Sequence, residues 1–403
     1  MIRLEDFAKS RSSRRRFLTT AAAAGVAGAS MPMFGGLGRL GARAQDAKNS
    51  VVWVSPRGTL EVLDDYPYWV GMQFGYFGDI ETELLPAIME STSSAKNVAD
   101  GDADMSYVSP GVFTDAITNG GLDLVSVFQM GAYDVFDIAL PKGNPDGVTT
   151  LKDLEGKTVV LGDIGWAAIV DPMVVQAGGD PSKINYVAAG PGWAQTLESG
   201  QADAALSWEG LRAQWLATGL DFDYILGYEW SKFPANAFQI RRSDFEDESL
   251  TDLYTRYLRG WAMGLEFGFQ NPVAATQITM EDPAISAALN ETFPDKNLAV
   301  TSMWQLANIF RGDWASRDGG KWGWADLDGW QAFFDDSATA SGSDSVDASA
   351  VIFNDYVAGA NEFDRDQVIA DASSFELSEE FAAVPMPDDA GLAGAGAEAT
   401  PAG

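Results

Sequence analysis

The chain contains no histidine and no cysteine, so its chemistry must come from other groups, such as carboxylates, aromatic rings, hydroxyls, amides and the side chains of lysine and arginine. These two absences remove Ser-His and Cys-His nucleophilic mechanisms, disulfides and the usual zinc ligands. The remaining residue types suit non-covalent binding of a small molecule, by stacking on flat rings and by hydrogen bonding. A hydrolase that uses a pair of carboxylates, Glu209 and Asp134, is the enzymatic alternative.

The candidate binding residues lie where an expected strand ends or an expected helix begins. In an open α/β sheet a ligand binds beyond the carboxyl ends of the strands, where helix N-termini offer unpaired N–H groups. The residues at such places are Asp65, Tyr66, Tyr68, Ser109, Pro110, Tyr133, Asp134, Gly165, Trp166, Trp208, Glu209 and Asn236. We expect Trp208 and Glu209 to be the most direct contacts. Ser109 and Pro110 are equally consistent with a simple helix cap.

Short apolar strands alternate with helical patterns, which is typical of an α/β fold. Strands are expected at 51–54, 80–85, 105–108, 122–128, 135–140, 158–160, 184–188, 202–206, 224–226 and 237–240, and helices at 67–77, 95–99, 110–118, 166–176, 193–199 and 211–218. An all-helical remainder follows, and its longest helix has apolar residues at helical spacing from Leu250 to Leu265. Residues 338–349 read as a loop, and the tryptophans at 314, 322, 324 and 330 as packing for these helices.

The N-terminal segment resembles a twin-arginine export signal. An arginine pair within Ser13–Leu18 precedes a weakly apolar run and a small-residue cleavage site at Ala42–Ala44. We therefore expect the twin-arginine translocase as a partner and a periplasmic, soluble product, which cannot be lipidated because there is no cysteine. The expected divisions are a signal at 1–44, lobe 1 at 45–138, lobe 2 at 139–233, the return to lobe 1 with the C-terminal helices at 234–385, and a disordered tail at 386–403.

The chain is strongly acidic, with 58 Asp and Glu against 26 Lys and Arg and a formal charge of −32. Such a chain repels nucleic acid. We interpret the acid excess as an adaptation to a saline (halophilic) habitat, in which salt screens the repulsion between like charges. A calcium site at Asp100–Asp104 is the sharper alternative, but the stretch lacks the glutamate at position 12 of an EF-hand loop. We expect no metal and a monomer.

Four pairs of stretches carry a family resemblance. The first pair is 68–70 with Gly75-Tyr76-Phe77, and the second is 101–104 with Ser109-Pro110. The third is Asp153-Leu154-Glu155-Gly156-Lys157 with 162–165, and the fourth is 200–204 with Trp208-Glu209. In this order they resemble the periplasmic substrate-binding proteins of ABC importers, in the group that takes nitrate, sulfonates, taurine and thiamine pyrimidines (NMT1/THI5-like). The resemblance implies the type II periplasmic binding protein fold, with two α/β lobes, a hinge and a ligand cleft between them. It also implies a binding protein rather than an enzyme, with a small-molecule solute and an ABC permease as partners and no cofactor.

Within that family, Trp208-Glu209-Gly210 resembles the Tyr-Glu-Gly of thiamine-pyrimidine binders, in which the glutamate pairs with an amino group. We therefore expect a small nitrogen-containing heterocycle as the solute. A sulfonate, taurine or nitrate is the alternative, and it would need helix N-termini with arginine or lysine. Arg57 is the only basic residue that we can place near the first-lobe cleft. Related pyrimidine synthases consume a histidine and carry a Cys-rich motif, so the absence of both residue types excludes their activity.

Overall fold

The computed structural model describes residues 48–56, 62–86, 92–132, 134–313 and 317–387. These residues belong to one compact unit, which begins at Lys48. The expected export signal, nearly all of the expected tail, Arg57, Tyr133 and Trp314 lie outside the described residues. Across the described ranges, no helix is both long enough and apolar enough to cross a membrane.

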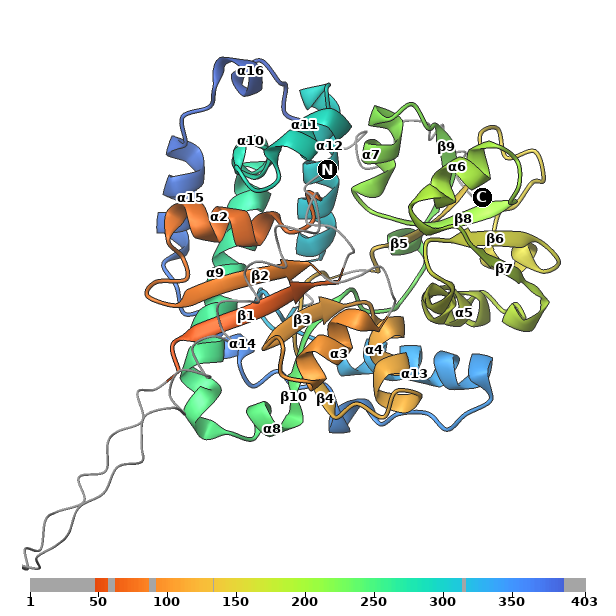
Figure 1. Cartoon of the computed structure of the whole chain (residues 1–403), viewed down its shortest axis with the longest axis horizontal. Coiled ribbons are helices and arrows are strands. Elements are labelled where there is room, and N and C mark those ends of the chain that lie inside the picture. Colours follow the sequence, from red (N-terminus) through yellow and green to blue (C-terminus); the bar gives the residue numbers. More distant parts are fainter. Residues whose placement is uncertain (1–47, 57–61, 87–91, 133, 314–316, 388–403) are drawn as a thin grey trace, which may run out of the picture. The chain divides into compact units, whose positions relative to one another are not determined.

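The first sheet has five strands in the order β2-β1-β3-β10-β4 (Figure 1). Their bounds are β1 Ser50–Ser55, β2 Glu81–Pro86, β3 Met105–Val108, β4 Leu124–Gln129 and β10 Ala237–Arg241. β1 is parallel to β2 and β3, whereas β10 is antiparallel to β3 and β4. The connecting helices are α2 (Tyr66–Phe74), α3 (Ser93–Ala99) and α4 (Pro110–Thr118). β3 and β4 are buried along their whole length, as expected for strands covered on both faces.

The second sheet has the order β7-β6-β8-β5-β9. Its strands are β5 Phe136–Pro141, β6 Thr158–Leu161, β7 Asn185–Ala188, β8 Ala204–Trp208 and β9 Phe222–Leu226, and its helices are α5 Ala167–Gln176, α6 Trp193–Glu198 and α7 Leu211–Ala217. β6 is parallel to β7 and β8, and β5 is antiparallel to β8 and β9. The chain enters this sheet at Phe136, so the lobe boundary expected after residue 138 falls inside β5.

Helices make up most of the chain after β10. They are α8 Arg242–Phe245, α9 Thr251–Gln270, α10 Pro272–Glu281, α11 Ser286–Thr292, α12 Lys296–Arg311, α13 Leu327–Ser341, α14 Val357–Ala360, α15 Arg365–Ser374 and α16 Glu379–Ala382. The apolar face predicted for the longest helix is confirmed, because its residues from Leu253 to Leu265 at that spacing are buried. α12 packs against α7 and α13 against α5, so the C-terminal helices contact the second sheet's helices (Figure 1).

The prediction of a loop at 338–349 was wrong for its first part. α13 continues to Ser341 and ends at Gly342, which adopts φ 70° as the C-cap. Serine and alanine can continue a helix when one face is anchored, and Trp330 and Phe334 are buried in the same helix. Trp322 and Trp330 have no exposed surface, which confirms them as packing residues.

Candidate functional site

A cleft lies between the two sheets, and residues of both form its walls. We define the cleft by its lining: Pro56, Val108, Ser109, Val112, Val135, Phe136, Trp166, Ile169, Leu206, Trp208 and Asn236. The cavity volume inside it is about 70 Å³, and the cleft is open to solvent. The candidates Ser109, Trp166, Trp208 and Asn236 are brought together here.

The first wall contains the ends of β1 and β3 and the start of α4, because carboxyl ends of parallel strands meet at one edge of a sheet. Ser109 is the N-cap of α4, and its Oγ accepts a hydrogen bond from the Val112 amide at 3.1 Å. Pro110 occupies the first helical turn, where proline needs no N–H partner. Ser109 is therefore both a helix cap and part of the cleft, whereas Pro110 is buried behind it.

The second wall is aromatic. Trp166 and Trp208 line the cleft with their ring centroids 6.1 Å apart and their planes at 83°. Behind them Trp193 stacks on Trp208 at 6.0 Å and donates its indole N–H to the Leu206 carbonyl at 2.9 Å. Because Trp193 is fixed in this way, it holds Trp208 in place, while Trp166 and Trp208 keep part of their surface exposed.

Asn236 lies on the segment that returns from the second sheet to β10. Its backbone carbonyl accepts a hydrogen bond from the Met130 amide at 2.8 Å. This bond joins the segment that leaves the first sheet after β4 to the segment that returns to it before β10. Its Oδ1 is sealed from solvent and has no hydrogen-bond donor within the described ranges. An acceptor left without a donor costs about 1–3 kcal/mol, so a ligand that donates to Asn236 would be favoured.

Three candidates at the start of α2 do not line the cleft. Asp65 has no exposed surface and accepts hydrogen bonds from Tyr107 and, at 3.2 Å, from Ser55. Tyr66 is buried and stacks on Phe310 with centroids 6.2 Å apart. Tyr68 packs among aromatic side chains that include Trp53, Trp69 and Trp261. These residues support the first wall from within the core, because the start of α2 faces inward.

Gly165 lies on a different hollow, a groove between α4, α5 and α13. The groove and the cleft are separated where Gly111 of α4 meets the backbone of α5 at Ala168. Gly165 is therefore placed outside the cleft, although the next residue, Trp166, lines it.

Glu209 and Asp134, the remaining candidates, belong to a buried charge cluster, which we define as Asp134, Asp137, Glu209 and Arg212. Arg212 Nη2 donates to both oxygens of Glu209, at 2.8 and 2.7 Å, and its Nε lies 3.6 Å from Asp137. Asp134 accepts from the Phe136 amide at 3.0 Å and from Ser231 Oγ at 2.6 Å. None of the four lines the cleft. This geometry argues against Glu209 as a direct ligand contact, and against Glu209 and Asp134 as a hydrolytic pair.

Burial controls the ionisation of this cluster. It raises the pKa of Asp134 to about 7, against the lowering effect of the Ser231 and Phe136 hydrogen bonds. The pKa of Asp137 is well above its usual range because of burial and the nearby Glu209 charge. Burial also raises the pKa of Glu209, although Arg212 opposes the shift. The cluster therefore contains more acids than its one arginine can neutralise.

The described residues contain no group of three or more carboxylates that could hold a metal ion together. In the stretch considered for calcium, Asp104 pairs with Lys48, accepts from the Val52 amide at 2.8 Å and lies 3.5 Å from Arg241. Asp104 therefore joins β3 to neighbouring elements.

The apolar part of the lining was missed by sequence reasoning. Pro56 lies just beyond β1 and Phe136 begins β5, which is the signal that could have identified them, whereas Leu206 is the middle residue of β8. They were overlooked because apolar residues at these places look like core.

A model of the NMT1/THI5 like family matches residues 64–275. No curated protein matches the chain. Among solved structures, the chain is similar to the alkanesulfonate-binding protein SsuA from Xanthomonas axonopodis pv. citri, solved with bound MOPS, at 11% identity and TM-score 0.55, covering 76% of this chain and 98% of that one. It is also similar to the ligand-binding component of an ABC-type import system from Staphylococcus aureus, at 9% identity and TM-score 0.55, covering 79% and 99%. A protein from Bordetella bronchiseptica RB50 has 17% identity and TM-score 0.54, covering 78% and 98%.

These structures confirm the expected fold, the α/β fold of periplasmic binding proteins, here with two five-stranded sheets and a cleft between them. The family match extends from the start of α2 through both sheets into α10. Because that match covers more than half of the sequence, the chain belongs to the NMT1/THI5-like family.

Proposed function

We propose that this protein is the solute-binding component of an ABC importer. It captures a small nitrogen-containing heterocycle in the periplasm and delivers it to the permease. The family and the fold support a binding role, and the cleft between the sheets supports a small solute. In this proposal, lobe 1 contains the first sheet, lobe 2 contains the second, and hinge motion closes them on the solute.

The observation that carries the proposed ligand class is the chemistry of the cleft walls. Trp166, Trp208 and Phe136 offer flat apolar surface, and no charged side chain occurs in the described lining. A flat heterocycle gains from stacking on such rings and can donate an N–H to Asn236. A sulfonate or nitrate would want an arginine or lysine, and the N-terminus of α4 is the only feature of the described lining that favours an anion.

The structure changes the role that we propose for Glu209. Its two carboxylate oxygens already bind Arg212, so it does not meet the amino group of a solute. Asn236 replaces it as the proposed acceptor, because Asn236 lines the cleft and its buried Oδ1 lacks a donor among the described residues.

The test is a solute panel read by tryptophan emission and by the melting temperature of the purified protein in molar salt. The panel contains aminopyrimidines, taurine, alkanesulfonates and nitrate. We expect an aminopyrimidine to change the emission of Trp166 and Trp208 and, at about 100 times its Kd, to add about 2.7 kcal/mol to the free energy of unfolding. Trp208→Ala should abolish the response. A clear response to taurine or a sulfonate, with none to aminopyrimidines, would show that the solute is a sulfonate-type ligand and not a heterocycle.

We also propose that the protein is exported by the twin-arginine translocase and works as a soluble monomer. Replacing Arg14 and Arg15 by lysine together should leave the protein in the cytoplasm, while the matched change at Arg3 and Arg11 should not affect export. Fractionation of cells that express each variant measures this. Export of the Arg14 and Arg15 variant at the normal level would rule out this route.

A further inference from the structure

The two exposed tryptophans of the cleft form a corner rather than a flat stacking surface. Their planes are nearly perpendicular, at 83°, with centroids 6.1 Å apart. Phe136 adds a third ring to the same lining, and it is the register partner of Trp208 across β5 and β8. A flat neutral ring can stack on only one side of such a corner. A compact cation, in contrast, is attracted by the negative face of each ring it meets.

The acids of the buried charge cluster, which lies behind this corner, also favour a cation over an anion. Phe136 and Trp208 are each followed by a member of the buried charge cluster, Asp137 and Glu209 respectively. The cluster contains three acids and one arginine, and its carboxylates are at most 2% exposed. Whenever more than one of these acids is ionised, the cluster carries net negative charge, which favours a positive charge and disfavours an anion nearby in surroundings of low dielectric.

Two polar side chains of the cleft lining, Asn236 and Ser109, also favour a cation over an anion. Asn236 Oδ1 is an oxygen without a donor in the described part of the chain. Ser109 Oγ is already occupied as an acceptor for the Val112 amide, which reduces the capacity of the α4 N-terminus to hold an anion. The aromatic rings of the cleft, Asn236 Oδ1 and the acids of the buried charge cluster therefore all favour a positively charged ligand.

We propose that the cleft binds its solute as a cation, with a protonated or N-alkylated nitrogen held in the corner formed by Trp166 and Trp208. This inference rests on the proposed function as a solute-binding protein and narrows its ligand class. Trp166 and Trp208 contact the positive charge directly, and the buried cluster acts on it through space.

Proton release accompanies binding of a cation at this place. The pKa of Asp134 is raised to about 7 by burial, so this group is partly protonated near neutral pH. A positive charge in the cleft favours its ionised form. The affinity for a cation should therefore rise as pH increases through 7. The other groups around Asp134 are the cluster members Asp137 on β5, Arg212 on α7 and Glu209 between β8 and α7. Tyr224 on β9 and, in the 3-10 turn after β9, Tyr228 and Glu229 face the cluster, and burial raises the pKa values of the two tyrosines.

The experiment compares two probes of nearly the same shape by calorimetry. 1-Methyl-4-aminopyridinium carries a permanent positive charge, and 4-methylaniline is its neutral counterpart. We expect the cation to bind about tenfold tighter or more, and its affinity to rise between about pH 6 and about pH 8. The affinity of the neutral probe should stay constant. Asp134→Asn should flatten the pH dependence of the cation.

Variants separate the ring faces from simple packing. Trp208→Leu keeps apolar bulk but removes the aromatic face, so the preference for the cation should disappear. Trp304→Leu, a partly exposed tryptophan on α12 outside the cleft lining, is the control that should change neither probe. Equal binding of the two probes would overturn the inference but leave the proposed function in place. If neither probe binds and the protein responds to taurine or a sulfonate, both the inference of a cationic solute and the proposal of a heterocyclic solute would be overturned.

Discussion

Arg212 pairs with two of the three acids of the buried charge cluster. It binds Glu209 through two short hydrogen bonds and lies near Asp137, whose other oxygen accepts from the Gly227 amide at 3.0 Å. A buried charge that loses its partner is strongly unfavourable, by roughly 3–5 kcal/mol. Glu209 therefore has a structural task, which is to balance Arg212 behind the wall formed by Trp208.

Asp134 should make stability depend on pH. In the unfolded chain its pKa is near the usual value of about 3.9, while burial raises its pKa in the folded protein to about 7. As pH rises from 4 to 7, the unfolded form ionises first, so this residue lowers the free energy of unfolding across that range. Above 7 its contribution becomes constant. At about 1.4 kcal/mol per pKa unit, the loss should amount to a few kcal/mol.

The measurement is denaturant unfolding of the original protein and of Asp134→Asn at several pH values. Asparagine can still accept from the Phe136 amide and donate to Ser231, so the substitution keeps both contacts. The difference in stability between the two proteins should shift in favour of the variant as pH rises from 4 to 7. A difference that stays constant over this range would show that Asp134 is ionised at low pH in the folded protein.

The candidate site could be predicted only in part from the sequence. Ser109, Trp166, Trp208 and Asn236 could be predicted to lie together at the cleft, because strand ends and helix starts mark the edge of a sheet where ligands bind. Glu209 lies in the buried charge cluster and not in the cleft lining, and the sequence does not show which partner a carboxylate meets. Its spacing of three residues from Arg212 was the available signal, since residues at that spacing can pair.

At the scale of elements, the contact between α4 and α5 joins the first sheet's helices to those of the second beside the cleft. Gly111 allows it, because an added Cβ would press on the carbonyl of Ala168 and lie 2.8 Å from the Ile169 amide. Alanine normally favours a helix over glycine by about 1 kcal/mol. We expect Gly111→Ala instead to lower stability by roughly 1–3 kcal/mol, the usual cost of overpacking, and to weaken solute binding because α4 and α5 must move apart.

Gly192→Ala is a matched control for this prediction. Gly192 precedes α6, its φ is −92°, and an added Cβ would meet nothing within 4 Å. Its melting temperature and solute affinity should equal those of the original protein. If Gly111→Ala also binds solute with unchanged affinity, the contact between α4 and α5 is not needed for binding.

Element boundaries were predictable where a cap fixed them. α4 runs from Pro110 to Thr118, as predicted, because a serine cap and a proline in the first turn are unambiguous. The end of α13 was predicted too early, since its last turn is rich in serine and alanine and lacks an apolar face of its own. The anchor for that turn is the contact of α13 with α5, a tertiary interaction that local sequence does not reveal.

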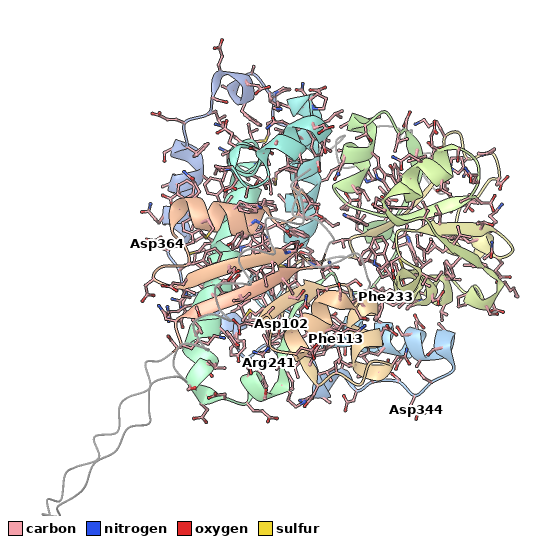
Figure 2. All side chains as sticks on the ribbon, viewed as in Figure 1. Asp102, Phe113, Phe233, Arg241, Asp344 and Asp364 are labelled. Atoms are coloured by element: carbon pink, nitrogen blue, oxygen red, sulfur yellow. The ribbon has the colours of Figure 1, made fainter. Side chains whose placement is uncertain are left out.

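At the scale of the whole molecule, the acid excess should make stability depend on salt. Exposed carboxylates such as Asp102, Asp344 and Asp364 project from separate parts of the surface (Figure 2). With 58 acids and 26 bases in the chain, many of them lack a basic partner, and their mutual repulsion favours expansion. Salt shortens the range of this repulsion to about 10 Å at 0.1 M and about 3 Å at 1 M.

We therefore expect the melting temperature at neutral pH to rise when sodium chloride is increased from about 0.05 M to about 1 M. Salt also strengthens apolar burial to some degree. A comparison of two pH values distinguishes this effect from the screening of charge repulsion. Near the sequence pI of about 4.1 the net charge vanishes, so the part of the increase that comes from screening should be lost. Thermal unfolding at both pH values and both salt concentrations measures this. An equal increase at pH 4 and pH 7 would assign the effect of salt to apolar burial, and the acidic surface would then have no part in the stability of this protein.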